Sequence, residues 1–375
     1  MAPVRLGMLR LTDAAPVVLA QEAGLFATED LDVVLSVEPS WANLADKLSY
    51  GLLDAAIMLP PLALAMSLGL RAAGTPLLVP MSLSLNGNAV TLSTALAGPI
   101  LGSRSALEAG RRLRTLLRGH ALPRLAVVHA RSTHHLLLRY WLAASGIDPD
   151  RDVAIGVIPP AEMVASLAAG RIDGFCAGAP WGVMAARDEL GRNVITSAEI
   201  WRNHPEKCLA VRADWAERRP AQLQALLRAL LRAAQRCDDP AEAPVLAELL
   251  AQQRYIGVPA DAIAASLAGG LAGGSVFFAQ AATYPWRSHA RWFLGQMARW
   301  GEVPAALDQD AAALRIYRPD LHAEAARALG LAVPRTDRKP EGGHDAPWQL
   351  AADPVPIEMA PDPFCDRASF PTRDA

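Results

Sequence analysis

Lys207 is the residue of this sequence whose type and position are best suited to binding a charged ligand. It ends the polar turn of the stretch Trp201–Leu209 and precedes the apolar run Cys208–Val211, which is typical of a buried strand. The sequence has many arginines but only three lysines, the other two being Lys47 and Lys339. A compact ammonium at a strand end suits a small anion, whereas the guanidinium fork of arginine suits a larger carboxylate or phosphate. The alternative is a surface lysine whose stem lies along apolar side chains.

Composition indicates a globular protein. The chain has 375 residues, 52% of them apolar and 20% charged, which is enough for two domains. Its net charge of −2 gives no reason to expect direct binding of nucleic acid or of an anionic membrane. The four cysteines are widely separated and lack the spacing of a zinc site, and three of them lie in an apolar or helical context that suits buried free thiols in a reducing compartment. We find no paired acid and base, nucleophile elbow or metal-ligand set, so we expect neither an enzyme nor a cofactor.

The N-terminal segment bears on localisation. Met1–Arg10 runs directly into a strand-like pattern, with no basic region followed by a long apolar region and no lipobox cysteine. The apolar stretch Leu59–Leu70 contains two prolines and is too short to span a bilayer. We therefore expect a cytoplasmic protein without a membrane span. A leader removed before this numbering is the alternative.

Alternating patterns predict two α/β units. Short apolar strands alternate with helices of about ten residues, which indicates parallel sheets covered by helices on both faces. Two crossings, near Leu92 and near Thr196, imply two lobes and a hinge. We assign residues 1–92 to the first part of lobe I, 93–195 to lobe II, and 196–332 to a mostly helical return to lobe I, in which the pattern predicts a helix over Pro220–Cys237. Residues 333–375, rich in Pro, Asp and Gly, are expected to form an extended tail that lies over the surface or is partly disordered.

The two lobes predict a ligand cleft between them. Ligands of open α/β sheets bind outside the carboxyl ends of the strands, so the turns that follow the strands should line this cleft. These turns carry the polar and aromatic residues that interrupt the apolar pattern: Thr12–Asp13, Ser40–Trp41, Leu59–Pro61, Asn86–Asn88, Ser132–His134, Gly178–Trp181 and His204–Lys207. Because His204–Lys207 is one of these turns, the cleft favours a binding role for Lys207.

Several short motifs, in order along the chain, carry a family resemblance. They are Pro39–Asn43, Leu85–Gly87, Thr133–His134, Arg139–Ala143, Gly178–Trp181 and His204–Lys207. With these motifs the chain resembles the nitrate/bicarbonate solute-binding proteins of ABC transporters, from its start to about Ala332. The resemblance implies a type II periplasmic-binding-protein fold, in which two α/β lobes are joined by a hinge and enclose the ligand in an interlobe cleft.

The resemblance also implies a set of ligand-binding residues for nitrate or nitrite. These are Trp41 of the SWAN-like turn, Asn88 after Leu-Asn-Gly, His134 of the Thr-His turn, Gly178 before Pro-Trp, and Lys207 of His-Pro-Glu-Lys. Asn88 departs from the glutamine expected in nitrate-transport members. Bicarbonate-binding relatives carry an acidic residue where Lys207 stands, so this sequence is similar to the nitrate-binding side of the family.

The chemistry of nitrate fits these residues. A planar monoanion with three weak acceptors is costly to bury without a cation and N–H donors, which Lys207 and His134 can supply. Each residue also has an ordinary structural interpretation. Trp41 can be a packing residue, and Gly178 a turn glycine. His134 can be a capping or core histidine, with the adjacent His135 competing for the role.

The resemblance implies a regulatory function as well. Without an export signal, the chain is most similar to the cytoplasmic nitrate/nitrite sensors of the NasS type. Such a sensor pairs with an RNA-binding antiterminator of the ANTAR type, a NasT-like protein, and releases it when nitrate or nitrite binds. The alternative function is that of a nitrate receptor of an ABC transporter. An enzyme on the same fold would need a reactive His or Cys in the cleft.

Overall fold

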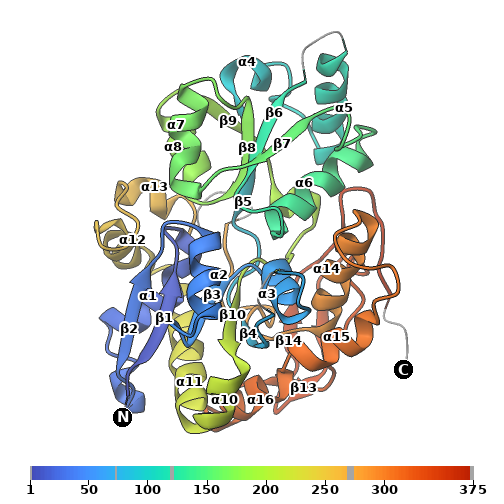
Figure 1. Cartoon of the computed structure of the whole chain (residues 1–375). Coiled ribbons are helices and arrows are strands. Elements are labelled where there is room, and N and C mark those ends of the chain that lie inside the picture. Colours follow the sequence, from blue (N-terminus) through green and yellow to red (C-terminus); the bar gives the residue numbers. More distant parts are fainter. Residues whose placement is uncertain (1, 72–73, 119–121, 268–273, 372–375) are drawn as a thin grey trace.

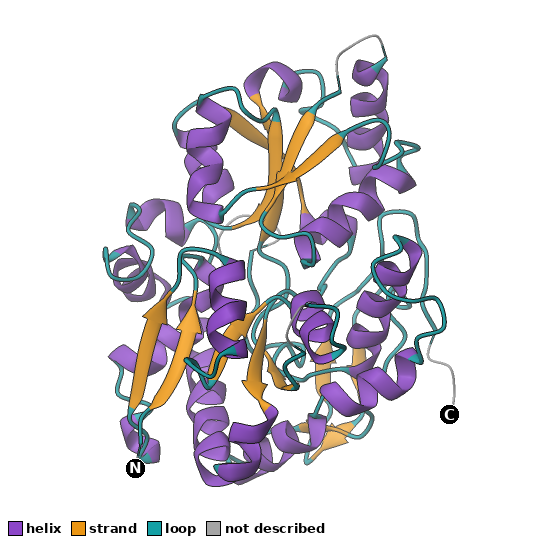
Figure 2. Cartoon of the chain, in the orientation of Figure 1, coloured by secondary structure: helices purple, strands orange, loops and turns teal. Residues whose placement is uncertain are grey.

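The computed structural model describes residues 2–71, 74–118, 122–267 and 274–371. It contains two five-stranded sheets, each flanked by helices, one in each lobe (Figures 1 and 2). The predicted fold class, two α/β lobes, is confirmed. The lobes are in contact, since the backbone N–H of Thr12 in lobe I donates to the carbonyl oxygen of Ala179 in lobe II at 3.1 Å.

The sheet of lobe I has the strand order β2-β1-β3-β10-β4. Its strands are β1 (Val4–Met8), β2 (Val33–Val37), β3 (Ala55–Met58), β4 (Leu77–Ser82) and β10 (Cys208–Arg212). The helices between its first four strands are α1 (Ala15–Glu22), α2 (Trp41–Ser49) and α3 (Pro60–Ser67). Strands β1, β2 and β3 are parallel, whereas β10 is antiparallel to both of its neighbours.

The sheet of lobe II has the order β7-β6-β8-β5-β9. Its strands are β5 (Asn88–Ser93), β6 (Arg124–Val127), β7 (Ala154–Val157), β8 (Gly174–Gly178) and β9 (Gly191–Thr196). Its helices are α4 (Thr94–Ala97), α5 (Ala106–Leu117), α6 (Thr133–Ala144), α7 (Met163–Ala168) and α8 (Trp181–Arg187), with α9 (Ser197–Ile200) at the return to lobe I. Strands β6, β7 and β8 are parallel, and β5 runs antiparallel to β8 and β9.

The expectation of purely parallel sheets is therefore wrong for the two strands that follow the crossings. The chain reaches both β5 and β10 from the other lobe. Each strand therefore enters its sheet from the side that faces the other lobe, where the neighbouring parallel strands have their carboxyl ends. The chain must then run in the opposite direction to those strands. As a consequence, Asn88 at the start of β5 and Lys207 just before β10 both lie at the interlobe edge.

The first crossing lies earlier in the chain than expected. We placed it near Leu92, but the whole of β5 pairs within the second sheet. The chain turns just before this strand, where Asn86 and Gly87 have backbone φ angles of 60° and 89°. The boundary of lobe II therefore precedes Asn88. The second crossing follows the end of β9 at Thr196, where we expected it.

The C-terminal third is mostly helical, as expected. Its helices are α10 (Ala213–Arg218), α11 (Pro220–Cys237), α12 (Ala243–Ala251), α13 (Ala260–Ala264), α14 (Arg287–Arg299), α15 (Gln309–Ile316) and α16 (Pro319–Ala328). The amphipathic pattern predicted α11 with its observed bounds. It did not predict α15.

The tail is ordered from residue 333 to residue 371. It forms two small antiparallel pairs, β11 (Val333–Pro334) with β13 (Ala352–Asp353) and β12 (Trp348–Leu350) with β14 (Ile357–Met359). Beyond them, Phe364 is buried and stacks on the indole of Trp201, with 4.6 Å between the ring centroids. This part of the predicted tail thus lies over the surface and is anchored in the core. Residues 372–375 lie outside the described residues.

Within the described residues, no helix is both long enough and apolar enough to cross a membrane.

Candidate functional site

Lys207 is at the centre of a buried cluster between the lobes. Its ammonium nitrogen lies 2.8 Å from Asp13 Oδ2 and also forms an ion pair with Glu206. It lies 5.6 Å from the centre of the Trp41 ring, within the range of a cation–π contact. The side chain of Lys207 is 0% exposed. The alternative of a surface lysine is therefore excluded.

Trp41 is placed by the first turn of α2. The hydroxyl of Ser40 caps this helix by accepting from the backbone N–H of Asn43 at 3.2 Å. Trp41, Leu44 and Leu48 share the buried face of the helix. Trp41 is part of the apolar core and also faces the ammonium of Lys207, and its indole Nε1 has no hydrogen-bond partner. The packing interpretation and the binding interpretation therefore both apply to this residue.

His134 and not His135 is turned toward the cluster. His134 Nε2 lies 3.4 Å from Glu206 Oε1, and neither of its ring nitrogens has a hydrogen-bond partner. His135 Nδ1 contacts the carbonyl oxygen of Ala130 at 2.5 Å and lies 3.6 Å from Glu302. The geometry thus resolves the ambiguity between the two neighbouring histidines.

The N-terminus of α6 adds a favourable field for negative charge. The hydroxyl of Thr133, the first residue of this helix, donates to the backbone carbonyl oxygen of Glu206 at 3.3 Å. The twelve-residue helix therefore begins next to the cluster. Aligned peptide dipoles give such an end a partial positive charge, which favours an anion close by.

Asn88 and Gly178 face each other across the antiparallel pair of β5 and β8. The side-chain nitrogen of Asn88 donates to Glu206 Oε2 at 2.5 Å, which leaves Asn88 Oδ1 without a partner. A Cβ atom at Gly178 would lie 3.4 Å from Asn88 Oδ1 and 3.6 Å from Asp13 Oδ2. A larger side chain at position 178 would therefore fill the space between these two oxygens.

The structure thus brings all five predicted residues together, namely Trp41, Asn88, His134, Gly178 and Lys207. Their role in binding an anion stays a prediction. One of the two N–H groups of the Asn88 side-chain amide is donated to Glu206.

Sequence reasoning missed the two carboxylates of the cluster, Asp13 and Glu206. Both are buried, with 6% and 1% of their surface exposed. Asp13 belongs to the 3₁₀ turn Thr12–Ala14 that follows β1, and Glu206 directly precedes Lys207. The signal was present, since each lies in a turn that was expected to line the cleft. Lys207 was treated as a single charge, whereas it forms ion pairs with two carboxylates.

Burial and mutual attraction together determine the protonation of Lys207, Asp13 and Glu206. Burial opposes the charge of Glu206, but the ammonium of Lys207 and the nearby histidines outweigh this effect and lower its pKa to about 2. Burial also opposes the charge of Lys207, yet the two carboxylates raise its pKa above the ordinary value. For Asp13 burial is the dominant effect, and it raises the pKa even though Lys207 opposes the shift.

The histidines of the cluster are neutral near pH 7. Burial lowers the pKa of His134 to about 3, and it also lowers the pKa of His204. His204 Nε2 lies 2.7 Å from the hydroxyl of Ser197, and that hydroxyl accepts from the backbone N–H of Asn88 at 3.2 Å. His204 and Ser197 therefore form a second layer that supports Asn88. A neutral imidazole retains one N–H donor, so His134 can donate one hydrogen bond.

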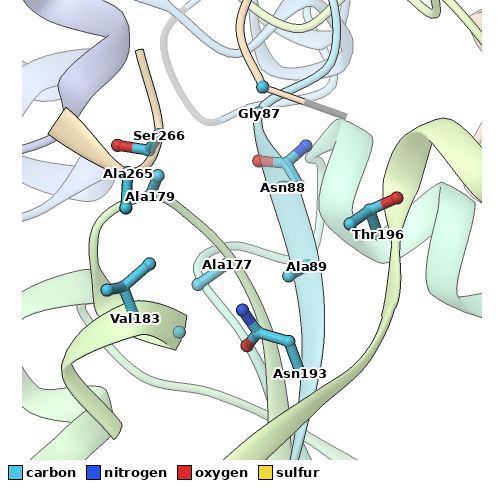
Figure 3. A pocket seen from close by; sticks show the side chains of 12 residues that line it. Gly87, Asn88, Ala89, Ala177, Ala179, Val183, Asn193, Thr196, Ala265 and Ser266 are labelled. Carbon is cyan, nitrogen blue, oxygen red and sulfur yellow. The ribbon is translucent and has the colours of Figure 1, made fainter. Parts of the chain in front are cut away.

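A small cavity adjoins the cluster at Asn88. Its volume is about 50 Å³, which is room for water-sized occupants. Figure 3 shows Asn88 on its wall together with Ala177 and Ala179 of lobe II, and with Ala265 and Ser266, which come from the C-terminal part of the chain. The cavity is therefore interlobe, like the cluster.

The buried thiols and the unpaired nitrogens of the site differ in what they can do chemically. Cys176 and Cys208 are buried free thiols, and burial raises the pKa of each, which disfavours the nucleophilic thiolate. Within the described residues, no group of three His, Cys, Asp or Glu side chains is placed to hold a metal ion. The cluster offers a buried cation and unpaired nitrogens of Trp41 and His134.

The chain forms two α/β lobes, crosses between them twice and has a buried polar site between them. These features define a solute-binding protein of the type II periplasmic-binding-protein class. The crystal structure of the periplasmic nitrate-binding protein NrtA from Synechocystis PCC 6803 has this fold. It superposes with a TM-score of 0.87 at 28% identity, covering 98% of this chain and 95% of that one. The alkanesulfonate-binding protein SsuA from Xanthomonas axonopodis shares the fold, with a TM-score of 0.61 at 18% identity, over 83% of this chain and 98% of that one.

The chain belongs to the NMT1-like family, whose model matches residues 1–251. It is 42% identical to the bicarbonate transport ATP-binding protein CmpC of Synechococcus elongatus, over 88% of this chain and 50% of that protein. It is 35% identical to the nitrate/nitrite binding protein NrtA of the same organism, over 87% of this chain and 78% of that protein. These similarities confirm the resemblance to nitrate and bicarbonate solute-binding proteins.

The chain spans about half the length of the ATP-binding transport proteins that it matches. None of its three lysines stands in a G-x-x-x-x-G-K motif, the phosphate-binding loop of many ATP-binding proteins. The similarity to the NasS-type sensors stays a prediction.

Proposed function

We propose that this protein binds nitrate or nitrite at the Lys207 cluster and acts as a cytoplasmic sensor that controls nitrate assimilation genes. The observation that carries the proposal is the buried ammonium of Lys207 between the lobes, next to the unpaired nitrogens of Trp41 and His134. A monoanion with weak acceptors needs a cation and N–H donors when it leaves water. The relatives named for nitrate binding support this choice of ligand.

Contacts from both lobes give the anion a means of switching the protein. Lobe I supplies Trp41 and Lys207, and lobe II supplies Asn88, His134 and Gly178. An open cleft would offer the anion only one of these groups of contacts, so binding favours the closed form. A shift of the population from 1:99 to 99:1 requires about 5.5 kcal/mol of differential binding.

In this proposal the ligand-free form holds an ANTAR-type antiterminator, a NasT-like protein, and the closed form releases it. The sensor then needs no contact with nucleic acid of its own, which accords with its net charge of −2. The four free cysteines suit the reducing cytoplasm in which such a partner acts.

Titration of the full chain with nitrate, nitrite and bicarbonate tests the ligand assignment. Calorimetry together with tryptophan fluorescence should show that nitrate or nitrite binds with one site per chain, while bicarbonate binds more weakly. Trp41 should report the event, because its ring faces the ammonium. Tight binding of bicarbonate with no response to nitrate or nitrite would reject the assignment and favour the chemistry named for CmpC.

The alternative function is that of a nitrate receptor of an ABC transporter. The identity of 35% to the nitrate/nitrite binding protein NrtA favours it about as well as it favours the sensor. Co-purification from the native host distinguishes the two functions. A sensor should retain a small antiterminator in anion-free buffer and lose it when nitrate is added. A complex that is indifferent to nitrate and nitrite would reject the sensor.

A further inference from the structure

We propose that anion binding at the Lys207 cluster takes up one proton, and that Asp13 is the group that receives it. This inference rests on the proposed binding of nitrate or nitrite and concerns how the same site balances its charge. It assigns Asp13, which lies outside the five residues implied by the family resemblance, as a residue that determines when the site accepts an anion.

The charge count of the cluster is the first argument. Lys207 contributes one positive charge, while Asp13 and Glu206 contribute two negative charges when both are ionised. The other titratable groups facing the cluster, which are His134, His204, Cys176 and Cys208, are buried and neutral. The sum is −1. A monoanion added to this site would bring the sum to −2, with no further cation among the described residues of the cluster.

The contacts of the two carboxylates identify the one that accepts a proton. Glu206 is held in its charged form by Lys207 and by the amide of Asn88, and its pKa is about 2. Its backbone is fixed as well, since its N–H donates to the carbonyl oxygen of Ser84 at 2.9 Å. Among the described residues, the side chain of Asp13 pairs with Lys207 alone, and burial raises the pKa of Asp13. Asp13 is therefore the carboxylate that is more easily neutralised.

The position of Asp13 suits a protonated role beside the anion. Its Oδ2 lies 3.6 Å from the point where a Cβ would stand on Gly178, next to Asn88 Oδ1. A proton taken from solvent converts this oxygen from an acceptor into an O–H donor, which can point at an anion oxygen. It also weakens the ion pair and frees the ammonium of Lys207 to pair with the anion. The sum for the occupied site is then −1 again.

Among the described residues, Glu302 is a second buried carboxylate whose pKa is raised. It lies 3.6 Å from His135 at the contact between α6 and the segment after α14, and burial raises its pKa to about 7. The arginines Arg131 and Arg139 oppose this shift. Because Glu302 lies outside the cluster, a substitution of Glu302 shows whether a proton taken up on nitrate binding goes to Glu302 or to Asp13.

Calorimetric titration with nitrate, in two buffers of different ionisation enthalpy at the same pH, tests the inference. The wild-type chain should take up about one proton per nitrate bound at pH 8, and its Kd should rise about tenfold per pH unit above the pKa of Asp13. Nitrate binding without proton uptake, and with a Kd independent of pH, would overturn the inference and leave the proposed function intact. If nitrate does not bind at any pH, both fail.

Three variants locate the proton. Asp13→Asn, in which the side chain is neutral at every pH, should bind nitrate without proton uptake and with a Kd that no longer changes with pH. Asp13→Glu should restore the uptake, and Glu302→Gln should leave it at the wild-type value. Uptake that persists in Asp13→Asn, or that disappears in Glu302→Gln, would overturn the assignment to Asp13. If Asp13→Asn fails to fold, the other two variants and the two-buffer measurement on the wild type still decide.

Discussion

Two of the three lysines lie in clusters of closely similar composition. Lys207 meets Asp13, Glu206 and the ring of Trp41. In the second cluster, Lys339 forms ion pairs with Glu341 and Asp362, the latter at 3.5 Å, and lies 5.9 Å from the centre of the Trp286 ring. Each cluster also contains a buried histidine beside its glutamate, His134 in the first and His289 in the second.

The origin of the members distinguishes the two clusters. The Lys207 cluster takes its members from both lobes, including β5 and α6 of lobe II. In the Lys339 cluster, His289 lies in α14 and Trp286 directly precedes this helix, while the remaining members belong to the tail. This cluster therefore attaches the tail to one helix. The same side-chain types therefore join the two lobes in one place and attach the tail to a helix in the other. Residue composition alone does not reveal a binding site.

The largest effect that tests this comparison is on stability. Lys339→Met should lower the free energy of unfolding by about 3–5 kcal/mol, because Glu341 and Asp362 are left buried without a cation. Lys207→Met should cost less, since opening of the lobes lets water reach Asp13 and Glu206. Urea unfolding without nitrate measures both free energies. Equal losses would show that the Lys207 cluster is as permanent as the anchor of the tail.

The next effect is on affinity. Trp41→Phe retains an aromatic ring beside Lys207 but removes the unpaired indole N–H, and the lost hydrogen bond to an anion should raise the Kd for nitrate by about 10-fold to 100-fold. Trp286→Phe is the matched change in the other cluster and should leave the Kd unaltered. Calorimetry provides both values. A Trp41→Phe variant that binds nitrate as the wild type does would limit Trp41 to packing.

The smallest effect is on the pH dependence of stability, and here the clusters should behave alike. Burial lowers the pKa of both His134 and His289, so below about pH 6.5 the unfolded chain binds protons that the folded chain excludes. Stability should then fall as the pH falls, by about 1.4 kcal/mol per pH unit for each histidine. Thermal unfolding from pH 7.5 to 5 should show a shallower slope for His134→Gln and for His289→Gln. An unchanged slope in either variant would show that the substituted histidine does not contribute to the pH dependence of stability.

At lower pH, two buried carboxylates determine how the stability depends on pH. The folded-state pKa of Glu206 and of Glu341 is about 2, which is below the ordinary value of a glutamate. Each therefore contributes stability that is complete above about pH 4.5 and is lost as the pH falls toward 2.

The sequence was sufficient for many of the local elements, although not for α15, and the five predicted site residues lie close together. Apolar periodicity predicted α11 with its observed bounds, and Ser40 and Ser132 cap the helices α2 and α6, a role for which serine is a preferred residue. Local rules succeed here because the information lies within a few residues of the element.

Long-range arrangement was beyond the sequence. The antiparallel direction of β5 and β10 follows from the crossing of the chain between lobes, which no local pattern records. The neutralisation of Lys207 by Asp13 joins residues 194 positions apart (207 − 13), so charge pairing could not be deduced from either neighbourhood. The order of the tail depends in the same way on remote partners, as in the contact of Phe364 with Trp201.

The most direct test of the central claim is the titration of two variants with nitrate, Lys207→Met and Lys339→Met, by calorimetry at a temperature where both are folded. Each variant removes one buried ammonium and leaves two carboxylates behind. The account predicts that Lys339→Met binds nitrate as tightly as the wild type, whereas Lys207→Met shows no measurable binding. Undiminished nitrate binding by Lys207→Met would contradict it.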